Sequence, residues 1–410
     1  MKQLQRRVVV TGLGILSPIG NTIDDAWSSC VEGKSGITKV DIGLENNPVK
    51  IGGRLKNFKS ENFLDSKEIR RIDPFIQYGI IAANQSIENS GILESNIDLT
   101  KVGVNFGAGI GGIDTIEKNK ILLEDKGYKK VSPFFVPGSI VNMISGLVSI
   151  KHGFMGPNTS VVTACSTGNH CIGTAARSIA CGEADVMIAG GAEMASTPLS
   201  IAGFISARAL SMNSDPIAAS RPWDRDRDGF VLSDGAGSLV LEDFDHAKAR
   251  GATIHAEIIG FGTSSDAHHM TAPPEDGRGA ALSMSNAICD AEINLLDVDY
   301  INAHGTSTVL GDIAETIALK NVFGDSVPQI SSTKSMTGHT LGAAGAIESI
   351  FCIKAINEGI VPPTINLDNP DPLCNLNYTP FISIEKEVNI AMNNSFGFGG
   401  TNSTLVFKKI

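Results

Sequence analysis

Short runs of β-branched and other apolar residues alternate along the chain with stretches in which apolar residues recur at helical spacing. The clearest helical stretch follows Cys165, and Gly182 marks its predicted end. Positions i, i+3, i+4, i+7 and i+8 of this stretch share one helix face; they are Ile172, Ala175, Ala176, Ile179 and Ala180. Because strand and helix patterns alternate from end to end, the chain is predicted to have an α/β fold in which helices cover sheets.

Three pairs of segments predict two similar α/β halves, residues 1–253 and residues 254–410. The pairs are Val8–Gly14 with Ile258–Gly262, Val104–Gly107 with Ile301–Gly305, and Thr163–Gly168 with Thr333–Gly338. Each member of the third pair is expected to follow a strand, over 161–162 and 329–332, and to enter a helix of small residues. The second helix repeats the spacing of the first with Ala343, Ala346, Ile347, Ile350 and Phe351.

Equivalent loops of two such halves are expected to meet. Loops at the carboxyl ends of strands in an α/β sheet line a shared crevice. Cys165, His304 and the segment Lys334–His339 lie on loops of this kind. The repeat therefore predicts that these residues share one site.

Cys165 lies where a predicted strand meets a predicted helix. Unpaired N–H groups and the positive end of the macrodipole at a helix N-terminus favour a thiolate, which is the nucleophilic form of cysteine. The alternative interpretation is a small buried apolar residue, because free cysteine is commonly buried.

His304 and His339 lie in loops among small and polar residues. Histidine exchanges protons near neutral pH, although an isolated histidine can equally have a structural role. Together with Cys165, the two histidines could supply three zinc ligands. The sequence lacks the short-spaced ligand pair and the His-Glu-x-x-His helix that are typical of metal sites. We therefore expect a catalytic site without a metal.

Residues Gly107–Gly112 match the glycine spacing of dinucleotide-binding loops and follow a predicted strand over 101–106. A nicotinamide enzyme needs an acidic residue at the end of the next strand, roughly 20 residues further on. Residues 117–130 are charged and not strand-like, so a nicotinamide-dependent oxidoreductase is the weaker alternative. The chain also lacks the G-x-S-x-G elbow and the G-x-x-x-x-G-K-[ST] loop, which removes support for serine hydrolases and P-loop enzymes.

Charge disfavours a role in nucleic-acid binding. The chain has 33 Lys and Arg against 44 Asp and Glu, a net charge of −11, whereas nucleic-acid-binding proteins normally carry a basic excess. Lys67, Arg70 and Arg71 form the best local basic run, with an ordinary solvated helix face as the alternative.

Cysteine usage and hydropathy indicate the cell compartment of the protein. Seven cysteines without a Cys-x-x-Cys pair indicate a reducing, cytoplasmic compartment. The chain has no apolar run of about 18 residues, so no membrane span is expected. The apolar residues 8–16 are interrupted by glycines and are interpreted as a first strand, not as a signal peptide.

Five segments together closely resemble the β-ketoacyl-acyl-carrier-protein synthases, the condensing enzymes of fatty-acid synthesis. They are the Thr163–Cys165 elbow followed by Gly190–Glu193, then Arg221–Phe230, Asn302–Thr308, Lys334–His339 and Asn394–Asn402. The resemblance spans essentially the whole chain and implies a thiolase-like fold, with two α/β halves packed as a layered α-β-α-β-α body. It also implies a Cys-His-His triad of Cys165, His304 and His339. Residues 106–112 are more similar to type II elongating synthases than to type I.

This resemblance implies a two-step reaction. Cys165 would take an acyl chain from an acyl-carrier-protein thioester, and malonyl-acyl-carrier protein would then lose CO2 and attack the acyl-enzyme to give 3-oxoacyl-acyl-carrier protein. Lys334 would keep positive potential near the histidines, with Glu348 orienting its loop. Phe398 would supply an oxyanion N–H group and gate the entrance.

The same resemblance implies binding residues and partners. Thr306 and Thr308 would bind the phosphopantetheine arm, and Ile110 and Phe204 would line the acyl pocket. The acidic carrier protein would dock on four basic residues, Lys67, Arg70, Arg71 and Arg208. We expect a homodimer without an obligatory metal or organic cofactor. A type I synthase and a polyketide ketosynthase are the alternatives within the family, and Cys165 argues against a non-catalytic partner subunit similar to chain-length factors.

Overall fold

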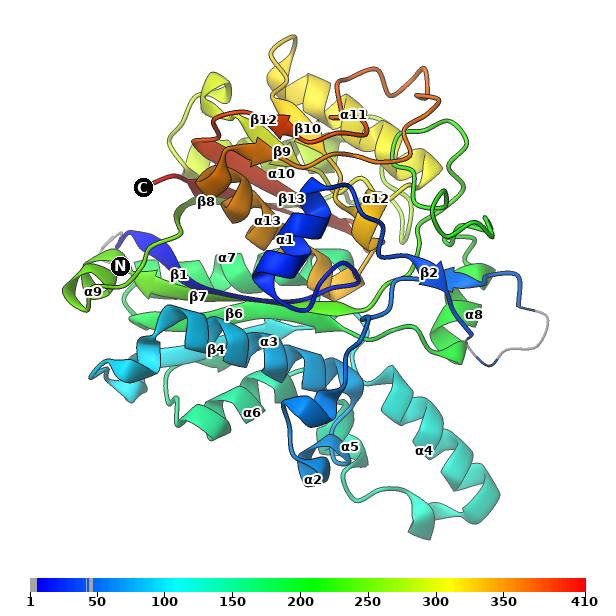
Figure 1. The fold of residues 1–410 in the computed structure, drawn as a ribbon, viewed down its shortest axis with the longest axis vertical. Helices are drawn as coiled ribbons and strands as arrows, with labels where there is room; N and C mark the ends of the chain where they lie inside the picture. The colour runs from blue at the N-terminus through cyan, green and yellow to red at the C-terminus, as the bar shows by residue number, and fades with distance from the viewer. Residues whose placement is uncertain (1–5, 42, 44–46) are drawn as a thin grey trace.

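The computed structural model describes residues 6–41, 43 and 47–410 and shows a layered body (Figure 1). Within this part of the chain, ten strands form one sheet in the order β10-β9-β13-β14-β8-β1-β7-β6-β4-β5. Its two halves meet where residues 8–10 of β1 pair with residues 256–258 of β8. The first half contains β1 (Val8–Leu16), β4 (Val102–Gly107), β5 (Asn158–Thr159), β6 (Val186–Glu193) and β7 (Gly235–Asp243). The second contains β8 (Ala256–Ser265), β9 (Tyr300–Asn302), β10 (Gln329–Ser331), β13 (Ile390–Gly397) and β14 (Thr401–Lys408).

The two halves of the sheet have the same topology. In each half the first strand lies at the shared border, followed by the fifth, the fourth, the second and the third. β4 runs parallel to β5 and β6, just as β9 runs parallel to β10 and β13. The two remaining strands of each half pair antiparallel. The internal repeat predicted from the sequence is therefore present in the fold.

Helices lie outside and between the halves of the sheet (Figure 1). The outer faces are covered by α3 (Pro74–Ser90) and α6 (Met143–His152) in the first half, and by α10 (Arg278–Asp290) and α11 (Val309–Phe323) in the second. Between the halves, α7 (Thr167–Ala180) contacts β6 and β14, and α13 (Ala344–Glu358) contacts β7 and β13. The predicted α-β-α-β-α layering is confirmed.

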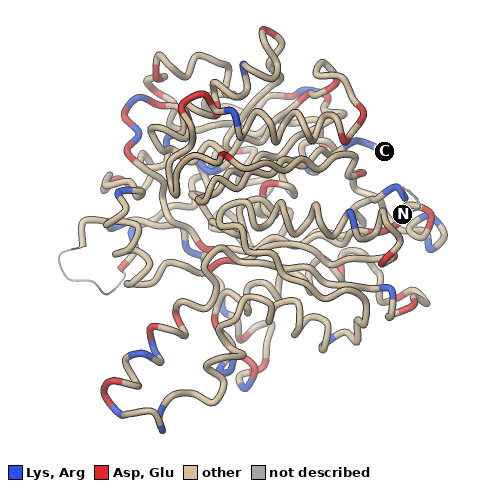
Figure 2. The backbone as a smooth tube through the Cα atoms, turned by 180° about the vertical axis from the view of Figure 1, so that it is seen from behind, with Lys and Arg blue, Asp and Glu red and all other residues tan. Residues whose placement is uncertain are grey.

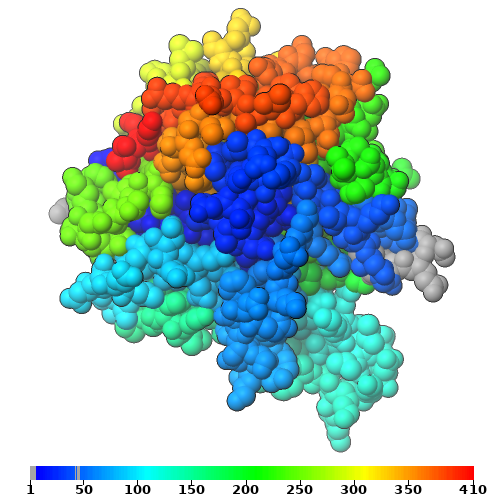
Figure 3. Space-filling model, in the orientation of Figure 1, coloured from blue at the N-terminus to red at the C-terminus, as the bar shows by residue number. Residues whose placement is uncertain are grey.

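The remaining elements decorate this body. The helices are α1 (Ile23–Val31), α2 (Ser66–Ile69), α4 (Ile113–Lys126), α5 (Phe135–Ser139), α8 (Pro198–Ser206), α9 (Phe244–Ala249) and α12 (Lys334–Thr337). The short strands are β2 (Thr38–Lys39), β3 (Ile51–Gly52), β11 (Ile360–Val361) and β12 (Ile384–Glu385). α4 projects from the body (Figure 1 and Figure 3). No helix in the described ranges is long and apolar enough to cross a membrane.

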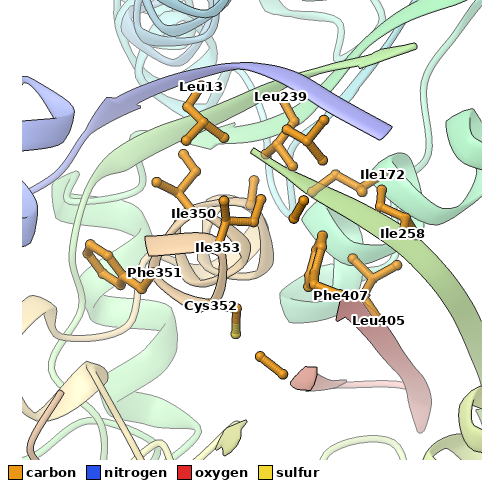
Figure 4. Close-up of a cluster of buried hydrophobic side chains, with 14 of the residues drawn as sticks. Leu13, Ile172, Leu239, Ile258, Ile350, Phe351, Cys352, Ile353, Leu405 and Phe407 are labelled. Carbon is orange, nitrogen blue, oxygen red and sulfur yellow. The ribbon is translucent and has the colours of Figure 1, made fainter. Parts of the chain in front are cut away.

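Side chains of both halves fill the central layer (Figure 4). Ile172 of α7 and Ile350 of α13 lie there with Leu13, Leu239 and Phe407 of the strands. The predicted apolar stripes of both helices belong to this cluster, with Ala180 only partly buried. Burial of apolar surface contributes about 25 cal/mol per Å², so this layer holds the starts of α7 and α13 in fixed positions.

Gly14 of β1 and Gly262 of β8 are equivalent positions of close contact. A Cβ atom added at Gly14 would lie 2.1 Å from the carbonyl oxygen of Ala82 in α3. One added at Gly262 would lie 2.1 Å from the carbonyl oxygen of Ser283 in α10. Glycine therefore lets each outer helix pack directly on the backbone of its strand, which confirms the first predicted segment pair.

The third predicted segment pair is misaligned. The 3-10 turn η5 (Ala164–Ser166) leads into α7, and its counterpart is η7 (Leu341–Ala343), which leads into α13. Ala164 and Leu341, which begin these turns, have similar φ angles of 50° and 46°. Residues 333–338 instead contain α12, an added helix that precedes the second turn.

Of the two strands predicted to precede the third segment pair, the first is wrong and the second is confirmed. The strand expected over 161–162 lies earlier, at β5, and its pairing with β4 ends at Thr159. Beyond Thr159 the chain leaves this edge of the sheet for the elbow, and Val162 is 53% exposed. The strand expected over 329–332 is β10.

Candidate active site

Cys165 is the middle residue of η5, and it is 8% exposed. Its turn is anchored on the second half of the fold. Ser166 Oγ hydrogen-bonds to the carbonyl oxygens of Ser395 and Thr401 at 2.9 and 2.7 Å, and Asn169 Nδ2 donates to the carbonyl oxygen of Asn393 at 3.0 Å. The thiol is therefore held at the border between the two halves.

His339 faces Cys165 from the second half. Its Nε2 atom lies 3.0 Å from the sulfur of Cys165. The backbone of His339 is fixed on both sides, because its N–H donates to Val231 at 2.8 Å and its carbonyl oxygen accepts from Ser233 at 3.0 Å. Gly338, with φ of 67°, makes the turn that brings the imidazole to the thiol.

His304 stands beside His339. The ring centroids are 5.4 Å apart and the rings are nearly perpendicular. The buried carboxylate of Glu315 in α11 accepts the backbone N–H groups of His304 and Gly305 at 2.9 and 2.7 Å. A carboxylate on a covering helix thus fixes the loop that carries His304.

Lys334 is buried behind the two histidines and forms an ion pair with Glu348 of α13. Burial raises the pKa of the Glu348 carboxyl to about 7, against the opposing effect of Lys334. The ion pair joins α12, the helix that begins at Lys334, to α13.

Burial dominates the pKa values of the thiol and of both imidazoles. It raises the pKa of Cys165 to about 12, opposed by the charge of Lys334 and by hydrogen bonds from the backbone N–H groups of Phe398 and Cys165. Burial also lowers the pKa of His304 and of His339 well below the usual range, and Lys334 adds to this effect. Burial therefore favours the neutral thiol and the neutral imidazole, in opposition to the thiolate that a helix N-terminus alone would favour.

A cavity of about 600 Å³ opens over this cluster. It brings together nine of the predicted residues: Ile110, Cys165, Phe204, Arg208, His304, Thr306, Thr308, His339 and Phe398. The hydroxyls of Thr306 and Thr308 are 3.1 Å apart on one wall. Phe204 packs edge-on against Phe230, at 5.4 Å between centroids, on another.

The other predicted residues lie outside the lining of this cavity. Lys334 is buried outside it, whereas Lys67, Arg70 and Arg71 are exposed on and after α2.

Phe398, which lines the cavity, is 38% exposed, and the loop that carries it turns through Gly399 and Gly400, with φ of 84° and 69°. The N–H of Gly399 donates to the carbonyl oxygen of Met270 at 2.8 Å, which ties the loop to the segment after β8.

Comparison with protein families decides what this arrangement is. The family model described as "Beta-ketoacyl synthase, N-terminal domain" matches residues 5–247, and "Beta-ketoacyl synthase, C-terminal domain" matches residues 255–368. The chain belongs to the β-ketoacyl synthase family. Its layered architecture is the thiolase-like fold that the sequence resemblance implied.

Relatives and solved structures agree. The chain is 52% identical to the 3-oxoacyl-[acyl-carrier-protein] synthase 2 of Vibrio harveyi over 99% of both chains. It is 51% identical to the protein of that name from Coxiella burnetii, again over 99% of both. A crystal structure of a β-ketoacyl synthase from Burkholderia phymatum superposes with a TM-score of 0.92 at 33% identity, covering 99% of this chain and 100% of the other. A type II polyketide ketosynthase bound to its acyl-carrier protein gives 0.92 at 35%, with the same coverage.

Two buried carboxylates of this synthase, Glu315 and Glu193, have positions at the site that their sequence motifs did not predict. Glu315 lies close to Ile313, Ala314 and Ile317 in α11, and an acid among such residues was a usable signal of a bound partner. Glu193 ends β6, and its carboxylate accepts backbone N–H groups of Gly109, Ile110 and Gly111. In a dinucleotide-binding protein, N–H groups of such a loop face a phosphate. Here the carboxylate already occupies them, which disfavours the oxidoreductase alternative.

The zinc alternative would require Cys165, His304 and His339 to hold one ion together. The described residues contain no group of three or more His, Cys, Asp and Glu side chains placed to hold a metal ion. Cys165 and His339 instead form a hydrogen-bonded pair.

Proposed function

We propose that this β-ketoacyl synthase elongates fatty acids by decarboxylative condensation. An acyl chain carried on Cys165 reacts with malonyl-acyl-carrier protein to give 3-oxoacyl-acyl-carrier protein, CO2 and free carrier protein. The observation that carries this proposal is the contact of 3.0 Å between Cys165 and His339, with His304 alongside, in a cavity of about 600 Å³. The names of the Vibrio harveyi and Coxiella burnetii relatives support it.

In the first step Cys165 acts as the nucleophile. His339 takes the thiol proton through Nε2 while the sulfur attacks the acyl carbonyl carbon. The backbone N–H groups of Cys165 and Phe398 hydrogen-bond the oxyanion, a type of contact typically worth about 3–4 kcal/mol. The bond to the carrier protein's sulfur then breaks, and this sulfur leaves as a thiol with the proton that His339 received.

In the second step the malonyl group loses its carboxylate as CO2. The electron pair of the broken bond becomes an enolate. The acylated sulfur no longer offers a proton to Nε2 of His339, so the neutral ring of His339 carries its proton on Nε2 in this step, and the N–H groups of His304 and His339 stabilise the enolate oxygen. The enolate carbon attacks the acyl carbonyl carbon on Cys165 and forms the new carbon–carbon bond. Cys165 leaves as a thiolate and takes up one proton, which restores the resting enzyme.

Electrostatics supports the neutral histidines that this mechanism requires. Burial and the nearby charge of Lys334 both lower the pKa of His304 and His339. Lys334 at the same time favours negative charge on Cys165. We propose that Lys334 acts through this field and not by contact with substrate, because it is buried outside the cavity lining.

The cavity walls supply binding roles. Thr306 and Thr308 present adjacent hydroxyls for the phosphopantetheine arm, and Ile110 and Phe204 present apolar surface for the acyl chain. Phe398 lies partly exposed at the cavity and gates it from a glycine-rich loop.

The acyl-carrier protein is the proposed partner. Lys67, Arg70, Arg71 and Arg208 are exposed, and Arg208 also lines the cavity. Figure 2 shows Lys and Arg positions interspersed with Asp and Glu positions along the backbone, so docking depends on local groups of basic residues and not on the net charge. A solved ketosynthase of similar fold is bound to its carrier protein.

Edge strand β5 supports a homodimer. It ends the sheet order, and an edge strand offers backbone groups that can pair with another chain. Three apolar side chains near it are exposed: Ile150, Met155 and Val162. The seven cysteines, all in the described ranges, are free, which supports the cytoplasmic location we propose.

The test is a product assay. Purified synthase with octanoyl-carrier protein and malonyl-carrier protein should give a product two carbons longer, read by mass spectrometry. Cys165→Ala should abolish this product. Cys171→Ala, which removes a buried thiol of the following helix α7, outside the cavity lining, should keep it. Absence of condensation by the wild type, or product from Cys165→Ala, would refute the proposal.

A further inference from the structure

Glu193 is a fully buried carboxylate whose hydrogen-bond partners are all backbone N–H groups. Oε2 accepts from Gly109 at 2.6 Å and from Gly342 at 3.1 Å. Oε1 accepts from Ile110 and from Gly111, both at 3.1 Å. One side chain on β6 therefore ties together the loop after β4 and the turn η7 of the other half.

Backbone N–H groups are the stabilising partners that this carboxylate has. No basic side chain in the described part of the chain forms an ion pair with it. Burial raises the pKa of Glu193 to about 7, while the four N–H groups act in the opposite direction. An unsatisfied buried charge is costly. Moving either the loop after β4 or the turn η7 away from the carboxylate would leave part of this charge unsatisfied, so both segments are held in place.

Both tethered segments line the cavity. Ile110 belongs to the first, and Leu341, which neighbours Gly342, belongs to the second together with His339. The junction has no spare space. A Cβ atom added at Gly342 would lie 2.3 Å from the backbone nitrogen of Gly109 and 2.9 Å from Oε2 of Glu193.

We propose that Glu193 is a positioning residue that sets the acyl-chain preference, because it fixes the cavity wall at Ile110 and the turn after His339 relative to each other. This inference rests on the proposed function, since it names what determines which acyl chain the same site accepts. Glu193 itself does not line the cavity and touches no substrate.

Glu193→Gln tests this role with little change in volume. The amide keeps one acceptor oxygen and places an NH2 group opposite N–H donors, so either Gly109 and Gly342 or Ile110 and Gly111 lose their acceptor. We expect the ratio of condensation rates with octanoyl- and hexadecanoyl-carrier protein to move toward one by about tenfold, as expected for loss of hydrogen bonds to a buried charge. Glu193→Asp should move it in the same direction by less, and it provides the test if the Gln variant does not fold.

Glu242→Gln is the matched control. Glu242 is also fully buried and lies on the neighbouring strand β7. It is at the opposite end of the β6–β7 pair, because Glu242 pairs with Val186 whereas Glu193 pairs with Gly235. It bonds to Arg250 and Thr11, outside the cavity lining. This variant should lose stability but keep the wild-type ratio of rates.

Backbone amide hydrogen exchange gives a readout that does not require turnover. Glu193→Gln should speed exchange at residues 109–111 and at Gly342, and Glu242→Gln should not. Unchanged exchange at these amides, or faster exchange with an unchanged ratio of rates, would overturn the role of Glu193. Failure of the wild type to condense would instead refute the proposed function, while the exchange experiment still reports on the tether.

Discussion

The two 3-10 turns that lead into the central helices, called elbows here, have similar backbone conformations but different side chains. η5 and η7 each begin with a residue at φ near 50° and each leads into a central helix. Their middle residues occupy equivalent places, yet one is Cys165, with a thiol that lines the cavity, and the other is Gly342, with no side chain. Gly342 contributes its N–H to Glu193 instead.

This difference shows how a repeated fold separates its tasks. The first elbow presents the side chain on which the proposed chemistry depends. The second elbow packs so tightly on Gly109 that only glycine fits, and the adjoining segment supplies His339. We infer that the first half provides the residue that holds the acyl chain. The second half provides the histidines that act on this residue and on the bound substrate.

The sharpest way to break the comparison is to give the second elbow a side chain. Gly342→Ala places a methyl group 2.3 Å from a backbone nitrogen, and such overpacking should lower the free energy of unfolding by about 3 kcal/mol and abolish condensation. Gly203→Ala is the control, because a Cβ atom there meets nothing within 4 Å. Denaturant unfolding measures both. A stable, active Gly342→Ala variant would show that the second elbow has room for a side chain.

The histidine pair should separate the two chemical steps. His304→Ala and His339→Ala should each slow malonyl decarboxylation by about 10²- to 10³-fold, because each removes one donor to the enolate. Only His339 lies within hydrogen-bonding distance of Cys165, so His339→Ala should also slow acylation by roughly 10²-fold, whereas His304→Ala should leave it nearly intact. Rapid-quench mass spectrometry of the acyl adduct measures this step. Equal acylation rates in both variants would contradict a proton transfer to His339.

Lys334→Met should have a smaller effect than the histidine variants, and the effect should appear in the pKa values of the site. Lys334 opposes the effect of burial on Cys165, so its loss raises the pKa of the thiol further, and alkylation by iodoacetamide at pH 8 should slow several-fold. The same change should raise the pKa of His304 and His339, which NMR can follow. Lys354→Met, on α13 but paired with Glu358, is the control. Alkylation as fast as in the wild type would show that Lys334 does not act on the thiol.

The smallest effect is expected outside the two elbows. Reversing the charges of Lys67, Arg70 and Arg71 should raise KM for carrier-protein substrates by several-fold at low salt and by less at high salt, because exposed charges are screened. Self-acylation from a small acyl thioester should not change. An unaltered KM would return these residues to an ordinary solvated surface.

Periodicity was enough to predict an α/β fold and the buried stripes of α7 and α13. The internal repeat predicted the meeting of Cys165 with His304 and His339. These features follow from residues that are close in sequence or that repeat. The layered body was implied by the family resemblance, whose motifs also added the expected roles. The misaligned elbow pair shows the limit of the repeat, since Thr333–Gly338 resembles the first elbow in letters while Leu341–Ala343 matches it in backbone angle.

The missed features depend on the surroundings of single residues. Glu193 accepts from backbone groups 82 to 149 residues away, and Glu315 accepts from those of His304 and Gly305, 11 and 10 residues earlier. Nothing in the local spacing of either acid identifies those partners. The pKa of the Cys165 thiol depends on its surroundings in the same way. A helix N-terminus is visible in the sequence, but the burial that raises the pKa of this thiol is a property of the assembled halves.

The central claim is that Cys165 carries the acyl chain and that the second half of the fold delivers the attack on it. Peptide mass spectrometry of the wild-type synthase tests this most directly. Incubation with acyl-carrier protein should add one acyl mass to the peptide containing Cys165, and malonyl-carrier protein should then discharge it as a product two carbons longer. An adduct on another residue, or one on Cys165 that malonyl-carrier protein leaves in place, would contradict the account.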